Sequence, residues 1–425
     1  MKLTNPNYCA TVIQIEKIVE LENCDNVCAA IIMGNQVIVS KEVMVGDIGL
    51  FFPVETKLSK DYLSANNLYR KKELNSDPEG KPGYFEENGR IRCVKFRGHK
   101  SEGLFMPINS LSFLSTDIKF KIGDEFNKIK DVEIADKYVI RNHSKGSNLS
   151  SGGKKSKENK IVDGQFNFHS NTSQLYKNLN QFEPNDLIQI TYKLHGTSGI
   201  SSYILCKKKL KWYEKLLIKI GVNIIDKEYG YIYSSRKVIK NPEINTNPSH
   251  YYSSDIWGMA HERIKHSLSK GMTFYYEIVG YLPNGLSIQE PYDYGCENTE
   301  FKVYIYRITQ TNEDGKVYEF SGKQVQDFCK KYGLEVVPEL YYGYAKEFSD
   351  ERMTEENWGY KFLDTLKEKY NDKDCYMCNN KVPEEGIVIR KEGIDLEAYK
   401  LKSNKFYEFE TKNLDSGKID IEEEN

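Results

Sequence analysis

Short apolar runs separated by turn residues dominate the first third of the chain. Glycine, aspartate and asparagine lie between these runs, which occupy residues 10–18, 27–32, 36–39, 49–53 and 90–96. Several short strands with such breaks between them are typical of a small β-barrel. A polar stretch between residues 58 and 87 interrupts the runs and contains a candidate short helix at 61–68. The pattern predicts a small barrel over residues 1–136.

A polar segment then separates this region from the rest of the chain. Residues 141–164 are rich in serine, glycine, asparagine and lysine, and they contain no apolar period. Such a composition cannot bury a core and is typical of a flexible linker. We therefore expect a linker over residues 137–165 and a second domain over residues 166–425.

The second region mixes β-branched runs with helical periods. Strands are predicted at 187–193, 199–205, 274–279, 302–308, 386–390 and 398–401. Trp257, Ile264 and Leu268 recur at the spacing of one helix face, which predicts a helix over residues 253–269. Two further helices are expected at 324–332 and 355–370. The fold class that follows is α+β, with strands in sheets flanked by helices.

Length and composition agree with a folded protein of two domains. The chain has 425 residues, which is more than one ordinary core contains, and 39% of them are hydrophobic. The net charge of −2 excludes the global basic field of many nucleic-acid binders but leaves room for a local basic groove. Neither an export signal nor an apolar span of membrane length is present, so we expect a cytoplasmic protein with no membrane partner. No pattern indicates an obligate protein partner.

The cysteines show no disulfide framework. Nine are scattered along the chain, and only Cys375 with Cys378 and Cys24 with Cys28 lie close in sequence. A zinc site would need two more ligands at suitable spacing, and neither pair has them nearby. Free thiols in a reducing compartment are favoured over zinc.

The most specific chemical feature is the segment that begins at Lys193. Leu194, His195 and Gly196 follow it at the end of a β-branched run. A lysine becomes a nucleophile when its ammonium loses a proton, and both desolvation and nearby cations lower its pKa. The glycine allows the backbone to turn tightly against a nucleotide. The pattern alone is unspecific, because Lys330 begins another Lys-x-x-Gly at the end of a predicted surface helix.

Further segments in a fixed order supply the missing context. Arg236 follows a tyrosine-rich run, and Glu277 places a carboxylate within an otherwise apolar run. Residues 384–390 then combine two glutamates with an apolar strand. Lys400 and Lys402 follow on one face of a predicted strand, since side chains alternate. Two adjacent ammonium groups need an anion between them, and phosphate is the obvious candidate.

In this order the segments resemble the motifs of the covalent nucleotidyltransferase superfamily, which comprises polynucleotide ligases and mRNA capping enzymes. The Lys-Leu-His-Gly-Thr-Ser form is similar to that of RNA ligases, whereas DNA ligases and capping enzymes carry Lys-x-Asp-Gly. The resemblance covers residues 187–406. It implies an ATP-dependent RNA ligase with an adenylyltransferase domain over 166–425, in which antiparallel sheets are flanked by helices in an ATP-grasp-like arrangement.

The resemblance also implies a catalytic role for Lys193 as the nucleophile. Lys193 would attack the α-phosphate of ATP, expel pyrophosphate and hold AMP as a phosphoramidate. The backbone around Tyr192 and Leu194 would meet the adenine edge. Lys400 and Lys402 would bind the α-phosphate and lower the pKa of Lys193.

Three matched positions would hold the nucleoside. Arg236 and Glu277 would bind the ribose, and Tyr306 would stack on the purine, where the family often has phenylalanine. Phe301 and Tyr304 remain alternatives for the stack, because each lies in the same apolar strand. Tyrosine can replace phenylalanine in this role, since stacking depends on the ring face.

A divalent metal, Mg²⁺ or Mn²⁺, is implied as well. Glu385 would position the hydrated ion, with Glu277 the second carboxylate in reach. His195 replaces the aspartate of other members, so the arrangement around the metal differs from theirs.

The N-terminal region carries a second resemblance. Residues 45–53 and 97–104 are similar to the OB-like domain of Deinococcus-type RNA ligases, which implies an OB-like barrel over residues 1–136. DNA ligases and capping enzymes instead carry an OB domain after the last lysine motif, and only 23 residues follow Lys402 here. The implied reaction joins 3′-hydroxyl and 5′-phosphate ends through lysyl-AMP and an adenylylated 5′ end, at nicks in RNA or RNA-containing duplexes. A DNA ligase, a capping enzyme and a catalytically idle RNA-binding relative remain the alternatives.

A basic cluster in the N-terminal region is a candidate RNA contact. Its members in the sequence between residues 90 and 100 include Arg92, Lys95, Arg97 and Lys100. Side chains of this kind bind the phosphate backbone without reading its sequence. Alternation along the run also allows some of them to point into solvent with no partner.

Overall fold

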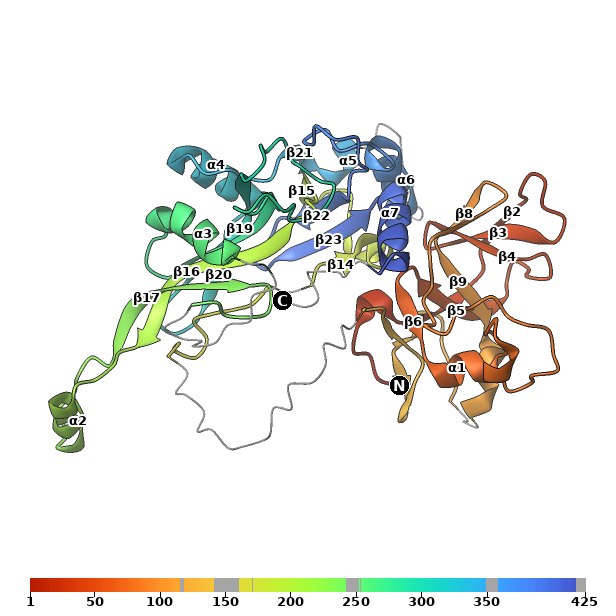
Figure 1. Cartoon of the computed structure of the whole chain (residues 1–425), viewed down its shortest axis with the longest axis horizontal. Coiled ribbons are helices and arrows are strands. Elements are labelled where there is room, and N and C mark those ends of the chain that lie inside the picture. Colours follow the sequence, from red (N-terminus) through yellow and green to blue (C-terminus); the bar gives the residue numbers. More distant parts are fainter. Residues whose placement is uncertain are drawn as a thin grey trace.

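The computed structural model describes residues 1–114, 118–140, 160–169, 171–241, 252, 254–348 and 358–417. Apart from one parallel pair, in which Ser173–Gln174 lies beside Tyr399–Lys400, its strands form antiparallel sheets that helices flank, which confirms the α+β class. Figure 1 shows the strands of the N-terminal region beside the two larger sheets of the remaining chain. The predicted linker falls largely on residues 141–159, which lie outside the described residues. The domain boundaries drawn from it therefore stay predictions.

The N-terminal region builds five small sheets around its cores. The largest has the order β10-β1-β5-β9 and consists of β10 (Glu125–Phe126), β1 (Ala10–Gln14), β5 (Ile48–Pro53) and β9 (Gly103–Pro107). The others are β2 (Lys17–Val19), β3 (Val27–Ile32) and β4 (Asn35–Ser40), then β6 (Thr56–Leu58) with β13 (Ala135–Lys137), β7 (Val94–Phe96) with β8 (His99–Ser101), and β11 (Lys128–Ile129) with β12 (Val132–Glu133). Hydrogen bonds between the described strands do not join these sheets into one closed barrel.

Strand limits in this region differ from the predicted ones where the pairing changes. The run at 10–18 is divided between β1 and β2, which belong to different sheets. Within the run at 90–96, only Val94–Phe96 forms a named strand. The short helix is present as α1 (Lys60–Ala65), and Ser59 caps it by accepting a hydrogen bond from the Tyr62 amide.

Two five-stranded sheets form the framework of the remaining chain. The first has the order β14-β23-β22-β15-β21, with β14 (Ser173–Gln174), β23 (Glu397–Lys402), β22 (Gly386–Lys391), β15 (Leu187–Tyr192) and β21 (Glu339–Tyr344). The second has the order β17-β16-β18-β19-β20, with β17 (Lys227–Ser235), β16 (Thr197–Lys207), β18 (Met272–Gly280), β19 (Phe301–Thr311) and β20 (Val317–Glu319). All six strands predicted for this region are present. The sequence pattern indicated β17 only as a tyrosine-rich strand before Arg236, and it did not reveal β14, β20 or β21.

Helices α3 (Ile256–Ile264) and α4 (Gly322–Tyr332) pack against the second sheet. Trp257 of α3 and Val325 of α4 share one apolar core with Phe274 of β18. Ser321 and Gln324 form a capping box at the start of α4, and Gly333 ends the helix with a φ of 65°. The Lys-x-x-Gly that begins at Lys330 is therefore a helix end. Helices α5 (Ala345–Phe348) and α6 (Trp358–Tyr370) instead share a core with residues of β15 and β22 in the first sheet. Short 3₁₀ helices lie at Pro6–Tyr8, Lys72–Leu74, Ile108–Leu114, Leu175–Lys177, Leu179–Gln181 and Lys265–Ser267.

The N-terminal region packs tightly against the rest of the molecule. Ile32 and Val37 belong to the same buried cluster as Phe362 and Leu363 of α6. A Cβ atom on Gly34 would lie 2.5 Å from Leu363 Cδ2, so this contact requires glycine. The two regions thus share a core, and a shared apolar core fixes their relative position.

A C-terminal helix, α7 (Asn404–Asp415), provides the second contact between the regions. Arg90 donates from Nη2 and Nε to Glu55 at 2.7 and 2.8 Å, and from Nη1 to Asp415 of α7 at 3.1 Å. The Arg90 side chain is 1% exposed. Because a buried guanidinium needs its anionic partners, this network ties α7 to the N-terminal region.

We predict that Glu55→Ala lowers the free energy of unfolding. The cost should be about 3 kcal/mol, the lower end of the range for breaking a buried ion pair, because Asp415 remains beside Arg90. Urea unfolding followed by circular dichroism measures it. Glu87→Ala, which removes an ion pair to Lys71 with both side chains more than half exposed, is the matched control and should leave the urea midpoint unchanged. Equal midpoints for both variants would contradict the role of the buried pair.

Candidate functional site

The ends of three neighbouring strands bring the charged residues of the site together. β15 and β23 end, and the antiparallel β22 between them begins, at the same edge of the first sheet. Lys193 directly follows β15, Glu385 precedes β22, and Lys402 ends β23. The Lys193 amide donates to the Gly386 carbonyl at 2.8 Å, which fixes Lys193 beside the glutamate.

Gly386 makes this close approach possible. Its φ of +143° suits glycine, and a Cβ atom there would lie 2.1 Å from the Leu401 carbonyl oxygen. Gly196 has a similar function on the other side of Lys193, because its Cβ would lie 2.3 Å from the Ile278 carbonyl oxygen. The two glycines let the lysine segment contact both sheets.

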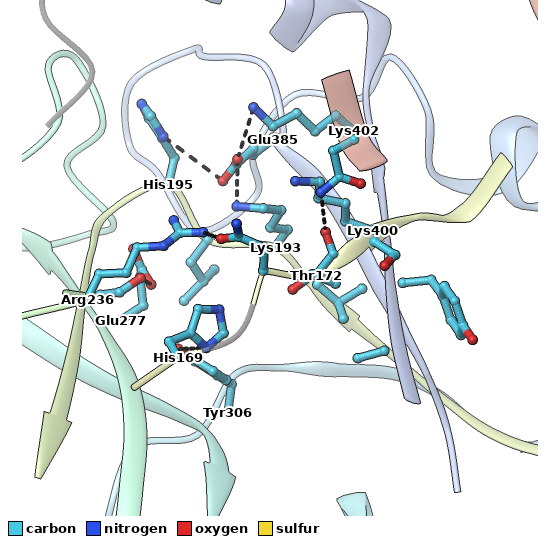
Figure 2. A pocket seen from close by; sticks show the side chains of 18 of the residues that line it. His169, Thr172, Lys193, His195, Arg236, Glu277, Tyr306, Glu385, Lys400 and Lys402 are labelled. Atoms are coloured by element: carbon cyan, nitrogen blue, oxygen red, sulfur yellow. Dashed lines mark hydrogen bonds and ion pairs between the residues drawn. The ribbon is translucent and has the colours of Figure 1, made fainter. Parts of the chain in front are cut away.

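Glu385 lies at the centre of the cation cluster, as Figure 2 shows. Its Oε1 is 2.7 Å from Lys193 Nζ and 3.9 Å from Lys402 Nζ. Lys402 also contacts both carboxylate oxygens of Glu410, on α7, at 3.0 and 3.2 Å. His195 Nδ1 lies 4.0 Å from Glu385 Oε2, and its ring packs edge-on against Phe406 of α7.

The two lysines of β23 have opposite electrostatic environments. Burial, followed by the charges of Lys402 and Lys193, lowers the pKa of Lys400 to about 7. Burial alone would also lower the pKa of Lys402, but neighbouring acidic groups, Glu410 first, hold it well above its ordinary value. Burial raises the pKa of Glu410, yet Lys402 more than offsets this and the pKa is lowered. Lys402 is therefore a fixed cation, and Lys400 is the lysine whose charge depends on an added anion.

The second sheet provides the opposite wall. Arg236 follows β17, and its Nη2 donates to Asn171 Oδ1 at 2.7 Å. Glu277 of β18 accepts a hydrogen bond from Ser198 Oγ at 3.0 Å. Both side chains are held before any ligand is present.

Tyr306 reaches this wall through a break in strand register. Tyr276 pairs with Ile305, whereas Tyr275 pairs with Arg307, so Tyr306 is the additional residue of a bulge in β19. A bulge redirects a side chain, and bulges are frequent beside active sites. Tyr306 lines the cavity, whereas the two alternatives for the stack, Phe301 and Tyr304, are buried in apolar cores.

All nine residues predicted to bind the nucleotide line one cavity of about 1070 Å³. They are Tyr192, Lys193, Leu194, Arg236, Glu277, Tyr306, Glu385, Lys400 and Lys402. The volume exceeds what a nucleotide requires. The N-terminal region contributes part of the lining, including Tyr8, Lys57 and Lys137.

Sequence reasoning missed several residues of this cavity. His169, whose ring lies edge-on to Tyr306 with centroids 5.7 Å apart, and Asn171 come from an irregular segment that had no recognisable pattern. Glu410 lies on α7, in the 23 residues considered only as too short for a domain. The Ser403 side chain accepts a hydrogen bond from the Phe406 amide and so caps the start of α7. In the sequence, this serine was the available signal for the helix.

Glu385 also fits a hydrated divalent cation. Its Oε2 is buried and accepts no hydrogen bond from any described residue. A buried carboxylate oxygen without a donor is costly, and Mg²⁺ retains several waters and needs few protein oxygens. No group of three His, Cys, Asp or Glu residues suited to a metal occurs in the described part of the chain. One carboxylate of this type suits Mg²⁺ or Mn²⁺ better than zinc.

Three of the four basic residues predicted to contact RNA form ion pairs with α7. Lys95 contacts Glu408 at 2.9 Å, Arg92 contacts Asp415 at 3.5 Å, and Lys100 contacts Asp372 at 3.1 Å. Arg97 donates to the Asn23 carbonyl. RNA phosphates would have to compete with these partners, and the RNA contact stays a prediction.

The nine cysteines are free thiols. Cys375 and Cys378 lie in the loop after α6, near the cavity, and Tyr376 between them packs against Tyr192 with ring centroids 4.9 Å apart. The loop therefore contacts the residue that precedes Lys193 through Tyr376. No helix of the described chain is both long and apolar enough to span a bilayer.

Comparison with protein families matches residues 186–405, more than half of the chain, to the family described as RNA ligase. Among solved structures, the chain is similar to Naegleria gruberi RNA ligase with PPi, at 16% identity and a TM-score of 0.58 over 96% of this chain and 100% of the other. Mutant forms with AMP and Mn (16% identity) and with ATP and Mn (17%) each have a TM-score of 0.57 over 94% of this chain and 98% of theirs. These identities establish a similar fold. No curated protein matches the chain.

The lowered pKa of Lys400 predicts a pH-dependent stability. Between about pH 7 and 10.4 the unfolded chain binds a proton at this position that the folded chain does not, so folding becomes more favourable as pH rises. Relative to Lys400→Met, the wild-type protein should gain about 1–3 kcal/mol of unfolding free energy from pH 6.5 to 9, the range allowing for solvent screening in the open cavity. Urea unfolding without nucleotide measures this gain. Lys381→Met, at a side chain 87% exposed, is the control and should keep the pH dependence of the wild type. An equal pH dependence of the unfolding free energy in Lys400→Met and Lys381→Met would contradict the prediction.

Proposed function

The chain belongs to the RNA ligase family, and from this premise we propose that it is an ATP-dependent ligase that transfers AMP through Lys193. One observation carries the proposal. Lys193, Glu385 and Lys402 meet at the ends of three adjacent strands, opposite Arg236 and Tyr306 on the second sheet. Cations on one wall with an aromatic ring on the other suit a nucleotide that presents its phosphates to the first wall and its base to the second.

In the first step, the Lys193 amine attacks the α-phosphorus and pyrophosphate leaves. Without nucleotide, Glu385 holds the Lys193 ammonium at 2.7 Å, and this pairing favours the protonated form. The positive charges of Lys402 and Lys400 lie on the same side of the cavity as Lys193. They favour the neutral Lys193 amine once the Glu385 carboxylate binds another cation instead. Glu385 therefore decides which form Lys193 adopts.

Glu385 is the residue that would hold the divalent metal, with its Oε2 as the available oxygen. The metal would supply neutralisation of charge on the phosphates during transfer. Naegleria gruberi RNA ligase has been solved with ATP and Mn, which supports ATP and a divalent cation as requirements of this chain too. Lys400 would gain a proton as the phosphates enter, because an anion raises its low pKa.

The nucleoside would lie against the second sheet. Tyr306 would stack on the purine, with His169 at the edge of the tyrosine ring. Arg236 and Glu277 would bind the ribose, from positions set by Asn171 and Ser198. The backbone at Tyr192 and Leu194 would contact the adenine edge.

The later steps would act on RNA ends. AMP passes from Lys193 to a 5′-phosphate, and a 3′-hydroxyl then attacks this activated phosphate and releases AMP. The N-terminal region supports a nick in a duplex as the substrate, since it lines the same cavity with Lys57 and Lys137 and is fixed to α7 by Arg90. A complementary strand that pairs with both RNA ends would keep these ends together at the cavity.

We predict that Lys193→Ala abolishes the mass increment of one AMP that wild-type protein acquires with ATP and Mg²⁺. Intact-protein mass spectrometry measures it. Lys330→Ala, which alters the exposed lysine of another Lys-x-x-Gly, is the matched control and should retain the full increment. A Lys193→Ala protein that still acquires AMP would contradict the assignment of the nucleophile.

Labelled nucleotides separate the proposal from its alternatives. Label from ATP but not from GTP should remain on the protein, and retention from GTP would instead identify a capping-type guanylyltransferase. An idle RNA-binding relative would bind RNA and acquire no label from either nucleotide.

The nick preference leads to a separate prediction. Wild-type protein with ATP should seal a nicked RNA duplex at least about 10-fold faster than it joins the same ends as free single strands, because the complementary strand supplies the proximity. Denaturing electrophoresis of matched nicks, with each strand RNA or DNA, measures the rates. Equal rates for nicked and free ends would exclude nick sealing while leaving the adenylylation step intact.

A further inference from the structure

A helical arm projects from the second sheet, far from the cavity. β16 and β17 form a hairpin whose paired ends are Lys207 and Lys227, and helix α2 (Trp212–Lys219) lies between them. Figure 1 shows α2 at the outermost point of the molecule, beyond the ends of both strands. No residue between 207 and 227, here called the arm tip, lines the cavity. The arm tip is therefore a surface that the proposed reaction does not use.

The arm tip exposes large apolar side chains. No residue of α2 is buried. Trp212 is 79% exposed, Ile220 70% and Ile225 79%, and the other exposed apolar residues of the tip are Tyr213, Leu216, Ile218 and Val222. Contiguous exposed apolar surface of this kind marks an interaction site. An eight-residue helix is also only marginally stable in water by itself, so burial of this face would stabilise it.

Charge on the arm tip has one predominant sign. It contains seven lysines and two acidic residues, a net charge of +5, whereas the whole chain has −2. At 100° per residue, Trp212, Leu216 and Ile220 share one side of the helix. Lys211, Lys215 and Lys219 are also four residues apart, so they lie together on another side of the helix. The helix is thus basic and amphipathic.

We infer that the arm tip is a docking site for the surface of an anionic lipid bilayer. A helix of this composition lies in the plane of the interface, with its apolar side chains among the acyl chains and its lysines against the anionic headgroups. Tryptophan, here Trp212, favours this boundary. The position of α2 at the outermost point of the molecule lets it meet a flat surface first. This binding is to a surface and does not require a helix that spans the bilayer.

Two other partners explain less of the arm tip. RNA would account for the lysines, but aliphatic side chains such as Ile220 and Ile225 gain nothing from contact with phosphates. A second copy of the chain would account for the apolar side chains. However, pairing of the arm tips of two copies would bring together two surfaces that each carry a net charge of +5, and these would repel each other. Anionic lipid matches both the apolar side chains and the lysines.

The test is co-flotation of the full chain with vesicles. Vesicles of phosphatidylcholine with 30% phosphatidylserine (about one anionic lipid in three) should carry the protein with at least about 10-fold higher partitioning than vesicles of phosphatidylcholine alone, since each lysine near an anionic surface adds to binding. Tryptophan fluorescence provides a second readout. Trp257 and Trp358 are 0% and 5% exposed, so a blue shift on addition of the anionic vesicles would come from Trp212.

Three variants locate the binding. A first variant that combines Trp212→Ser, Leu216→Ser and Ile220→Ser should lose flotation. A second variant that combines Lys211→Gln, Lys215→Gln and Lys219→Gln should have its flotation lowered at least about 10-fold. Ile394→Ser with Leu286→Ser, at side chains 93% and 62% exposed outside the arm, is the matched control and should float like the wild type. Thermal unfolding of each variant confirms that it is folded.

Each result decides for or against the inference. Flotation with anionic vesicles that the serine variant loses supports it. Failure to float with any vesicle overturns it, as does undiminished flotation of the serine variant. If vesicles do not bind and the arm variants instead weaken binding of an RNA duplex, the arm is an RNA contact. If they instead convert a dimer to a monomer in sedimentation, it is a contact between copies. None of these results depends on whether Lys193 acquires AMP.

Discussion

The carboxylate of Glu385, held among lysines, is the interaction on which the rest of the site depends. It lies 2.7 Å from Lys193 and 3.9 Å from Lys402, and one of its oxygens accepts no hydrogen bond from a described residue. Several cations within a few ångströms repel one another, and Glu385 and Glu410 together compensate only part of the charge of Lys193, Lys400 and Lys402. The remaining positive charge would suit a polyanion. Glu385 is also the point at which a divalent cation would alter the protonation of Lys193.

The fold provides this arrangement through strand pairing and one helix. Antiparallel pairing of β22 with β15 and β23 places Lys193, Glu385 and Lys402 at one edge, because strand ends and beginnings alternate across the sheet. Helix α7 then supplies Glu410, which stabilises the charge of Lys402 and leaves Lys400 to respond to a ligand. The N-terminal region holds the other side of α7 through Arg90 and adds its own side chains to the cavity. The cavity and the N-terminal region are therefore joined through α7 and through a shared lining.

Much of this could be predicted from the sequence, because strands and motif order are local properties. The six strands that carry the motifs were recognised from apolar runs, and the residues of those motifs converge on one cavity. Other features depend on tertiary contacts that no short pattern encodes. The bulge that turns Tyr306 into the cavity is a change of register between two strands, and Asn171 acts from a segment without regular structure. The pairing of Lys95 with Glu408 joins residues more than 300 positions apart, so a basic run that suggested an RNA contact could not be recognised as part of an interface.

Mapping of the AMP-bearing residue by tandem mass spectrometry tests the central claim most directly. Wild-type protein would be incubated with ATP and Mg²⁺, digested under conditions that preserve a phosphoramidate, and its lysine-containing peptides sequenced. The account predicts AMP on the side chain of Lys193 and on no other lysine. AMP on Lys400 or Lys402, the two lysines assigned to phosphate binding, would contradict it.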